Sequence, residues 1–150
     1  TLPLRLGASI AISRDGSKIA FPASDSTGTA HLYVRYLDRV EPMMVAGSER
    51  AGAPFFSPDG LSIGFGQGSG IRTVALAGGP LVSLCDWIGR GASWGDDGNI
   101  IFSSGGKLMR CTPAGGKAEL LLSPPAGATY VYPAHVPGTR AVRPAPRNIA

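Results

Sequence analysis

Residues 53–65, APFFSPDGLSIGF, contain two short apolar runs joined by a Ser-Pro-Asp-Gly turn. In such a turn proline presets its φ, aspartate bonds the backbone downstream, and glycine takes the positive φ that a tight hairpin needs. After the turn, Leu61, Ile63 and Phe65 alternate with small residues, which is the period of a strand with one apolar face. The stretch therefore predicts a β-hairpin.

The same hairpin pattern occurs three times in the chain. Its Asp-Gly turns at residues 15–16, 59–60 and 97–98 lie 44 and 38 residues apart, and alternating apolar residues follow each turn. In the middle unit a third apolar run at 71–76, a Gly-Gly turn and a fourth run at 81–84 come next, and the other two units align with it. Four short strands in about 40 residues form a β-propeller blade, which repeats because one twisted sheet cannot bury its apolar faces alone.

The sequence therefore predicts an all-β fold: a β-propeller fragment with about three four-stranded antiparallel blades plus a partial fourth. The expected ranges are a lead-in or the end of a preceding blade at 1–9, blades at 10–50, 51–88 and 89–127, and a degenerate fourth blade with a basic tail at 128–150. In the last range Pro144 and Pro146 are expected to break further pairing. Closed propellers have at least about four blades, so the remaining blades must come from a parent chain or from other copies of this chain.

Composition and charge agree with many short strands and argue against two classes of partner. The 150 residues include 22 Gly and 13 Pro, yet 43% are hydrophobic. The formal charge of +4 is concentrated in the tail, where Arg140, Arg143 and Arg147 lie, while the rest is nearly neutral. The sequence shows no basic stripe with interleaved aromatic residues, which is the pattern that predicts nucleic-acid binding. No run approaches the roughly 18 apolar residues of a membrane span, so direct membrane insertion is not expected.

The repeats resemble those of a known family. The turn at residues 57–60, the apolar residues Ile63 and Phe65, the strand that starts at Ile71 and the Ala77-Gly78-Gly79 turn resemble the WD40-like repeats of TolB-type propellers. The stretches LYVRYLD at 32–38 and GRGASWGDDG at 89–98 are similar to propellers attached to certain bacterial serine/threonine protein kinases. The resemblance implies an interaction or sensor domain of a larger bacterial protein. It also implies an extracytoplasmic location, periplasmic or at the cell surface, which the residues themselves do not indicate.

The function expected from this fold is non-enzymatic binding of a protein or peptide through rim loops. In a propeller, the loops that join the last strand of one blade to the first strand of the next gather on one rim. These loops contain Arg50, Trp87, Arg90 and Tyr130, and exposed Trp, Tyr and Arg are the residue types that anchor interfaces. Alternatively, Trp87 packs between blades and the arginines are merely solvated. The alternative function is a gating propeller fragment of a prolyl-oligopeptidase-type serine peptidase, whose catalytic domain would lie outside this chain.

One motif in the chain imitates a catalytic site. Residues 91–95, Gly-Ala-Ser-Trp-Gly, match the G-x-S-x-G nucleophile elbow of α/β-hydrolases, in which the serine sits on a strand-to-helix turn. Here the repeat alignment places Ser93 on the first strand of a blade, opposite Phe55, and a hairpin follows. His31 and His135 are the only candidate bases. We therefore expect no catalytic residue and no cofactor in this chain.

The aspartates of the turns and the two cysteines are expected to have structural roles. Ligands of one metal ion must converge, whereas these aspartates repeat once per blade, so we expect no metal site. The expected turn residues are Asp15, Gly16, Asp59, Gly60, Asp97 and Gly98. Cys85 and Cys111 have neither CxxC spacing nor a histidine at metal-ligand spacing. We interpret them as two small buried hydrophobic residues.

Overall fold

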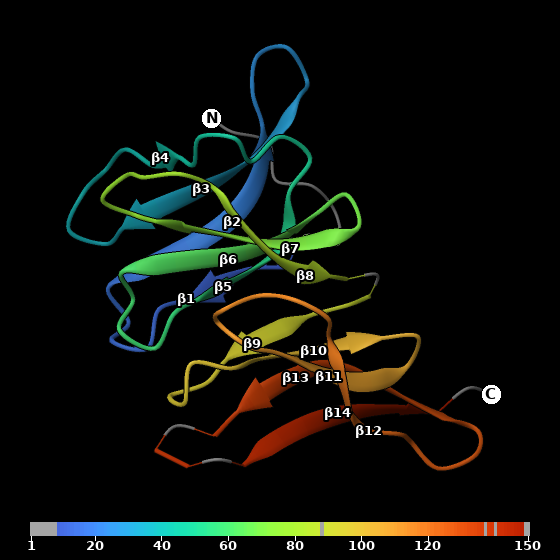
Figure 1. Cartoon of the computed structure of the whole chain (residues 1–150). Helices are drawn as coiled ribbons and strands as arrows, with labels where there is room; N and C mark the ends of the chain where they lie inside the picture. The colour runs from blue at the N-terminus through green and yellow to red at the C-terminus, as the bar shows by residue number, and fades with distance from the viewer. Residues whose placement is uncertain (1–8, 88, 137, 140, 149–150) are drawn as a thin grey trace. The chain divides into compact units, whose positions relative to one another are not determined.

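The computed structural model describes residues 9–87, 89–136, 138–139 and 141–148; most of the expected lead-in, residues 1–8, and Arg140 of the tail lie outside the described residues. The regular structure in these ranges is all β, and it forms three four-stranded sheets and one two-stranded sheet (Figure 1). In each sheet, strands consecutive in the chain are neighbours. The predicted all-β propeller fragment with a partial fourth blade is confirmed. In the described residues no helix is long and apolar enough to cross a membrane.

The strands are grouped by sheet, and their bounds are these. The first sheet contains β1 (Ala11–Ile12), β2 (Lys18–Ser24), β3 (Ala30–Tyr36) and β4 (Met43–Met44). The second contains β5 (Gly52–Phe56), β6 (Ser62–Gln67), β7 (Gly70–Ala75) and β8 (Val82–Asp86). The third contains β9 (Ala92–Trp94), β10 (Ile100–Ser104), β11 (Lys107–Cys111) and β12 (Glu119–Leu122). The two-stranded sheet contains β13 (Ala128–His135) and β14 (Val142–Asn148).

The Asp-Gly turns are closed by local hydrogen bonds. In the second turn Asp59 Oδ1 accepts from Ser57 Oγ and from Leu61 N (2.9 Å), and Gly60 has φ 67°. Because the hydroxyl and the amide stabilise the charged carboxylate, they hold the pKa of Asp59 below its ordinary value, with Ser57 as the larger cause. Asp15 and Asp97 make equivalent bonds in their own turns, to Ser13 and Ser17 and to Asn99. The turn aspartates thus serve the hairpins.

The chain divides into two compact units, which are described separately. Unit 1 comprises residues 1–68 and 72–82, and unit 2 comprises 69–71 and 83–150. The core of unit 1 joins side chains of β2, β3, β5 and β6 with flanking residues: Ala20, Leu32, Val34, Val45, Ala51, Phe56, Ile63 and Phe65. In unit 2 the fully or almost fully buried apolar side chains include Ile100, Phe102, Leu108 and Cys111. Phe65 and Phe102 occupy equivalent positions on the second strands of their blades.

One cross-strand pair of the second blade combines a large residue with a glycine. Phe55 pairs with Gly64, and a Cβ on Gly64 would lie only 2.3 Å from the Phe55 ring. The phenyl ring therefore covers the glycine backbone. In the third blade the equivalent pair is Ser93 with Ile101, in which the large residue has moved to the other strand. The equivalent pair of the first blade, Ala11 with Ala20, has two small residues, so this packing differs from blade to blade.

Pro144 and Pro146 do not end the pairing of β14, which matches β13 as far as Asn148. Tyr130 is the partner of Pro146, and its backbone N–H donates to Gly106 O (2.8 Å), so this N–H points away from β14. Paired residues of this kind on antiparallel strands both direct their backbone nitrogens away from each other, so the nitrogen of Pro146 also faces away from β13. The nitrogen of Pro144, two positions earlier, faces the same way. The missing N–H groups consequently lie on the outer edge of β14. The prediction that these prolines break pairing is wrong for this strand pair.

Cys85 on β8 and Cys111 on β11 form a disulfide, with their Cα atoms 6.4 Å apart. Both are buried, as expected, and the structure adds the bond between them, which the sequence does not decide. The pairing follows from folding, because the turn after β11 reaches β8, where Gly116 N donates to Leu84 O (2.9 Å). This contact brings β11 beside the last strand of the second blade. The disulfide therefore links two blades within unit 2.

Candidate partner-binding rim

The loop between β8 and β9 begins with a buried tryptophan. Trp87 is only 7% exposed, its backbone amide donates to Ser69 O (2.7 Å), and its indole Nε1 donates to Ser103 O (2.9 Å). A buried indole needs a partner for its N–H, and the end of β10 provides one. The expectation that Trp87 is exposed on the rim is therefore wrong. The alternative, in which it packs inside the fold, describes its environment.

Arg90 lies in the same loop and is exposed. Its amide donates to Ser103 Oγ (3.1 Å), and its carbonyl oxygen accepts from both Ser103 Oγ and Tyr132 N (3.1 Å). These three bonds hold the backbone on both sides of the Cα atom, while the side chain extends from it. The arginine is thus presented from a fixed position rather than from a loose loop.

Two tyrosines of β13 lie at the same end of unit 2. Tyr130 is half-buried, and its amide donates to Gly106 O in the turn between β10 and β11. Tyr132 is 53% exposed and bonds Arg90 through its amide. A Cβ on Gly91 would lie 2.7 Å from both Cα and Cδ1 of Tyr132, so the tyrosine crosses the glycine directly. Only glycine at position 91 leaves room for this approach.

Tyr132 was not among the predicted rim residues, and its backbone explains its exposure. It lies in a β-bulge of β13, with φ 49°. Ala53, within β5, and Gly91, just before β9, lie at the equivalent point of the repeat and also have positive φ, 47° and 76°. A bulge therefore occurs in both β5 and β13, and bulges redirect side chains. Aligning the repeats over this position would have revealed Tyr132 as a large residue where the other blades have Ser, Ala or Gly.

We define the unit 2 rim as Arg90, Lys107, Tyr130 and Tyr132, with Trp87 buried beneath it. Lys107 is exposed and begins β11, opposite Ser104 and next to Gly106, which bonds Tyr130. The structure thus brings together three of the four predicted residues, Trp87, Arg90 and Tyr130, at one end of unit 2. It buries the first of these and adds Lys107 and Tyr132.

Arg50, the fourth predicted residue, belongs to unit 1. It is exposed, has φ 57°, and its amide donates to Ala30 O (2.7 Å). The loop is anchored by Ser48, whose buried hydroxyl accepts from Leu32 N (2.9 Å) and donates to Val45 O. Arg50 is therefore also held on a well-anchored loop. A common rim shared by Arg50 and the unit 2 residues stays a prediction.

Beside Arg50 lies a histidine between two carboxylates. His31 is buried; its Nε2 is 3.2 Å from Asp25 Oδ2, and its Nδ1 is 4.0 Å from Glu49 Oε1. The Asp25 carboxylate also accepts from Thr27 and Thr29 in its own turn, and these bonds, Thr27 first, keep the pKa of Asp25 below its ordinary value. His31 thus ties the turn between β2 and β3 to the loop that holds Glu49.

Ser93, the serine of the elbow-like motif, lies on β9 and meets the second candidate base. His135 donates its amide to Ser93 Oγ (3.0 Å), and its Nδ1 lies 3.1 Å from the same oxygen. Because Oγ accepts from the amide, its own hydrogen can point to Nδ1. Strand β9 continues into the hairpin to β10 rather than into the helix of a nucleophile elbow. The Ser93–His135 pair ties β9 to β13.

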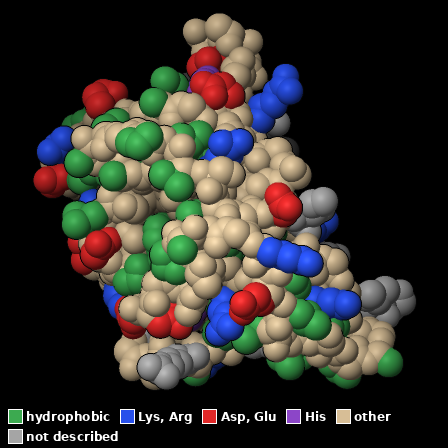
Figure 2. Space-filling view, viewed as in Figure 1, with side chains coloured by type: hydrophobic (Ala, Val, Ile, Leu, Met, Phe, Trp, Pro, Cys, Tyr) green, Lys and Arg blue, Asp and Glu red, His purple; other side chains and the backbone are tan. Residues whose placement is uncertain are grey.

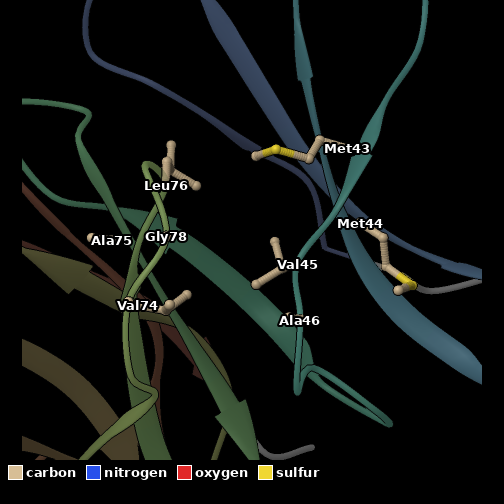
Figure 3. Close-up of a pocket in the computed structure, with 9 residues that line it drawn as sticks. Met43, Met44, Val45, Ala46, Val74, Ala75, Leu76 and Gly78 are labelled. Carbon is tan, nitrogen blue, oxygen red and sulfur yellow. The ribbon is translucent and has the colours of Figure 1, made fainter.

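Unit 1 contains an apolar pocket of about 180 Å³ between β4 and the turn after β7 (Figure 3). It is lined by Met43, Met44, Val45, Ala46, Val74, Ala75, Leu76, Gly78 and Gly79. In Figure 3 Met43 and Val45 point toward the β7 side, and Met44 points the other way. No charged or hydrogen-bonding side chain is among these described lining residues, so the pocket offers contact surface but no reacting group.

No protein-family model matches this sequence, and no curated protein sequence matches it. Solved structures do match. A putative TolB from Agrobacterium tumefaciens has a TM-score of 0.69 at 21% identity, over 83% of this chain and 48% of that one. TolB from Acinetobacter baumannii has a TM-score of 0.70 at 23% identity, over 99% of this chain and 41% of that one. A structure from a study of two prolyl endopeptidases reaches 0.56 at 20% identity, over 87% and 23%.

At these identities the matches show the fold. The chain is a β-propeller fragment. Its fold is similar to that of the two TolB structures, in line with the resemblance of its repeats, and it spans less than half the length of each. The similarity to kinase-associated propellers stays a prediction.

Proposed function

We propose that this chain is a non-enzymatic interaction or sensor module of a larger bacterial protein, with blades at 10–50, 51–88 and 89–127 and a partial fourth at 128–150. The module binds a protein or peptide through its rim loops. The observation that carries this proposal is the presentation of Arg90, exposed on a backbone held by three hydrogen bonds, beside the exposed Tyr132. Fixed anchors lose little freedom on binding, so more of each contact appears as affinity.

An extracytoplasmic location, periplasmic or at the cell surface, is part of the proposal. It is supported by the Cys85–Cys111 disulfide, because disulfides persist in oxidising compartments whereas cytosolic thiols are kept reduced. Acidic and basic side chains are interspersed on the face drawn in Figure 2, which suits a protein partner better than nucleic acid. Attachment to a receptor-type serine/threonine kinase is the parent architecture that we propose.

A gating propeller of a prolyl-oligopeptidase-type peptidase is the second candidate, and it is favoured by the match to prolyl endopeptidases. The two candidates differ in what is fused to the propeller. Sequencing the full reading frame separates them: an α/β-hydrolase domain downstream would overturn the non-enzymatic proposal for the parent protein, and a kinase domain upstream would support it.

Selection from a random peptide library displayed on phage tests the binding role. Peptides selected on the 150-residue chain should bind Arg90→Ala or Arg50→Ala more weakly than the parent, according to the loop that each peptide contacts. Lys117→Ala is the matched control, since Lys117 is an exposed cation of unit 2 in the turn between β11 and β12. Selected peptides that bind all four proteins equally would contradict a rim-loop site.

A further inference from the structure

The unit 2 rim carries positive charge that its own neighbours do not neutralise. Within the described residues, neither Arg90 nor Lys107 has an ion-pair partner, whereas Arg110 of the same unit bonds Glu119 at 2.6 Å. The charged residue closest in sequence to Arg90 is Asp86, at the end of β8. The rim therefore has two cations that no described acid neutralises, and one acid lies four residues before Arg90 in the sequence.

The backbone places both cations beside one short segment of β13. Arg90 O accepts from Tyr132 N, and Gly106 O, next to Lys107, accepts from Tyr130 N. The two amides are two residues apart on the same strand, so the arginine and the lysine are held beside neighbouring positions. The Tyr132 ring, half exposed, offers apolar surface next to Arg90.

We infer that the unit 2 rim binds an acidic peptide segment that also carries an apolar side chain. Carboxylates of the segment lie on Arg90 and Lys107, and the apolar side chain packs against Tyr132. This inference rests on the proposed function, whose partner it specifies. A peptide fits better than nucleic acid because the rim has two cations, with Asp86 close in sequence to one of them, rather than the continuous basic groove that tracks a phosphate backbone.

Fluorescence polarisation with labelled peptides tests the inference on the full 150-residue chain. A peptide of alternating Glu and Phe should bind, and added salt should weaken it. Arg90→Gln and Lys107→Gln should each weaken binding by about two- to fivefold, the range of an exposed ion pair. Asp86→Asn should strengthen binding, and Lys117→Gln should leave it unchanged. Tyr132→Ser should weaken it, while Tyr132→Phe keeps the ring and the affinity.

Three results would overturn the inference. A peptide of alternating Lys and Phe could bind as tightly as the acidic one, or the double variant Arg90→Gln/Lys107→Gln could bind like the parent. A single-stranded oligonucleotide that binds as tightly as the acidic peptide would assign the rim to nucleic acid. Unchanged circular dichroism and denaturation midpoints show that each variant is folded.

The outcome also separates this inference from the proposed function. If the phage-selected peptides are neutral or basic and still depend on Arg90, the rim binds peptides and the acidic specificity is wrong. If neither selected nor designed peptides depend on Arg90, Tyr132 or Arg50, both the inference and the proposed function fail.

Discussion

Breaking the disulfide between Cys85 and Cys111 should destabilise unit 2 by a calculable amount. The bond joins residues 26 positions apart, and the chain-entropy relation for a loop of this length gives about 3.5 kcal/mol at 25 °C. The reduced chain gains this freedom only when it unfolds. Because domains are stable by only about 5–15 kcal/mol, reduction should remove a large part of the stability.

Urea denaturation with and without reductant measures this effect. Both tryptophans, Trp87 and Trp94, belong to unit 2, so their fluorescence reports on the unit that holds the disulfide. Reduction leaves both sulfur atoms in place and isolates the bond itself. Replacing Cys111 by Ser should cost a further 1–3 kcal/mol or so, because the hydroxyl would be placed at a site that is 1% exposed.

The double variant Cys85→Ser/Cys111→Ser is the control, and its midpoint should not respond to reductant. Equal unfolding free energies for oxidised and reduced parent protein would refute the reasoning. Two titratable thiols in the chain unfolded without reductant would show that the disulfide does not form.

Three further predictions concern single residues. Gly64→Ala should destabilise unit 1 by about 1–3 kcal/mol because its methyl group meets the Phe55 ring; Gly52→Ala, where nothing lies within 4 Å, is the control, and equal urea midpoints would contradict the packing. Because hydrogen bonds lower the pKa of Asp59, its charged carboxylate stabilises the folded state. This contribution is complete above the unfolded-state pKa of about 3.9. Stability should fall as the pH drops below that value, and Asp59→Asn should reduce the slope of midpoint against pH; an unchanged slope would count against it. Ser93→Ala should leave any hydrolase activity of the parent protein unaltered, and lost turnover with intact folding would make Ser93 catalytic.

The three hairpins were predictable because their interactions are local. Ser57, Asp59 and Gly60 close their turn with bonds that span no more than five residues, so the sequence contains both partners of every bond. Repetition of this local pattern then predicted the sheets and the propeller, since a single blade leaves apolar faces that another blade must cover. Even the partial fourth blade could be predicted, although the effect of its prolines could not.

The candidate rim was predictable only in part. The position of Arg90 in a loop between blades follows from the repeat, but its fixed backbone depends on Ser103 and Tyr132, which lie 13 and 42 residues away. Trp87 was wrongly expected to be exposed, because residue type alone does not show that Ser103 offers its carbonyl to the indole. Tyr132 depends on a backbone bulge, and its exposure follows from φ rather than from hydrophobicity.

The sequence by itself thus determined the strands, their turns and the repeating sheet, because these depend on residues a few positions apart. Only the tertiary structure decided that Cys85 is bonded to Cys111, that Ser93 meets His135, and that β14 turns its proline nitrogens away from β13. Each of these depends on which strand lies beside which and on which side a residue faces. Packing between blades decides both, and no pattern within one blade contains that information.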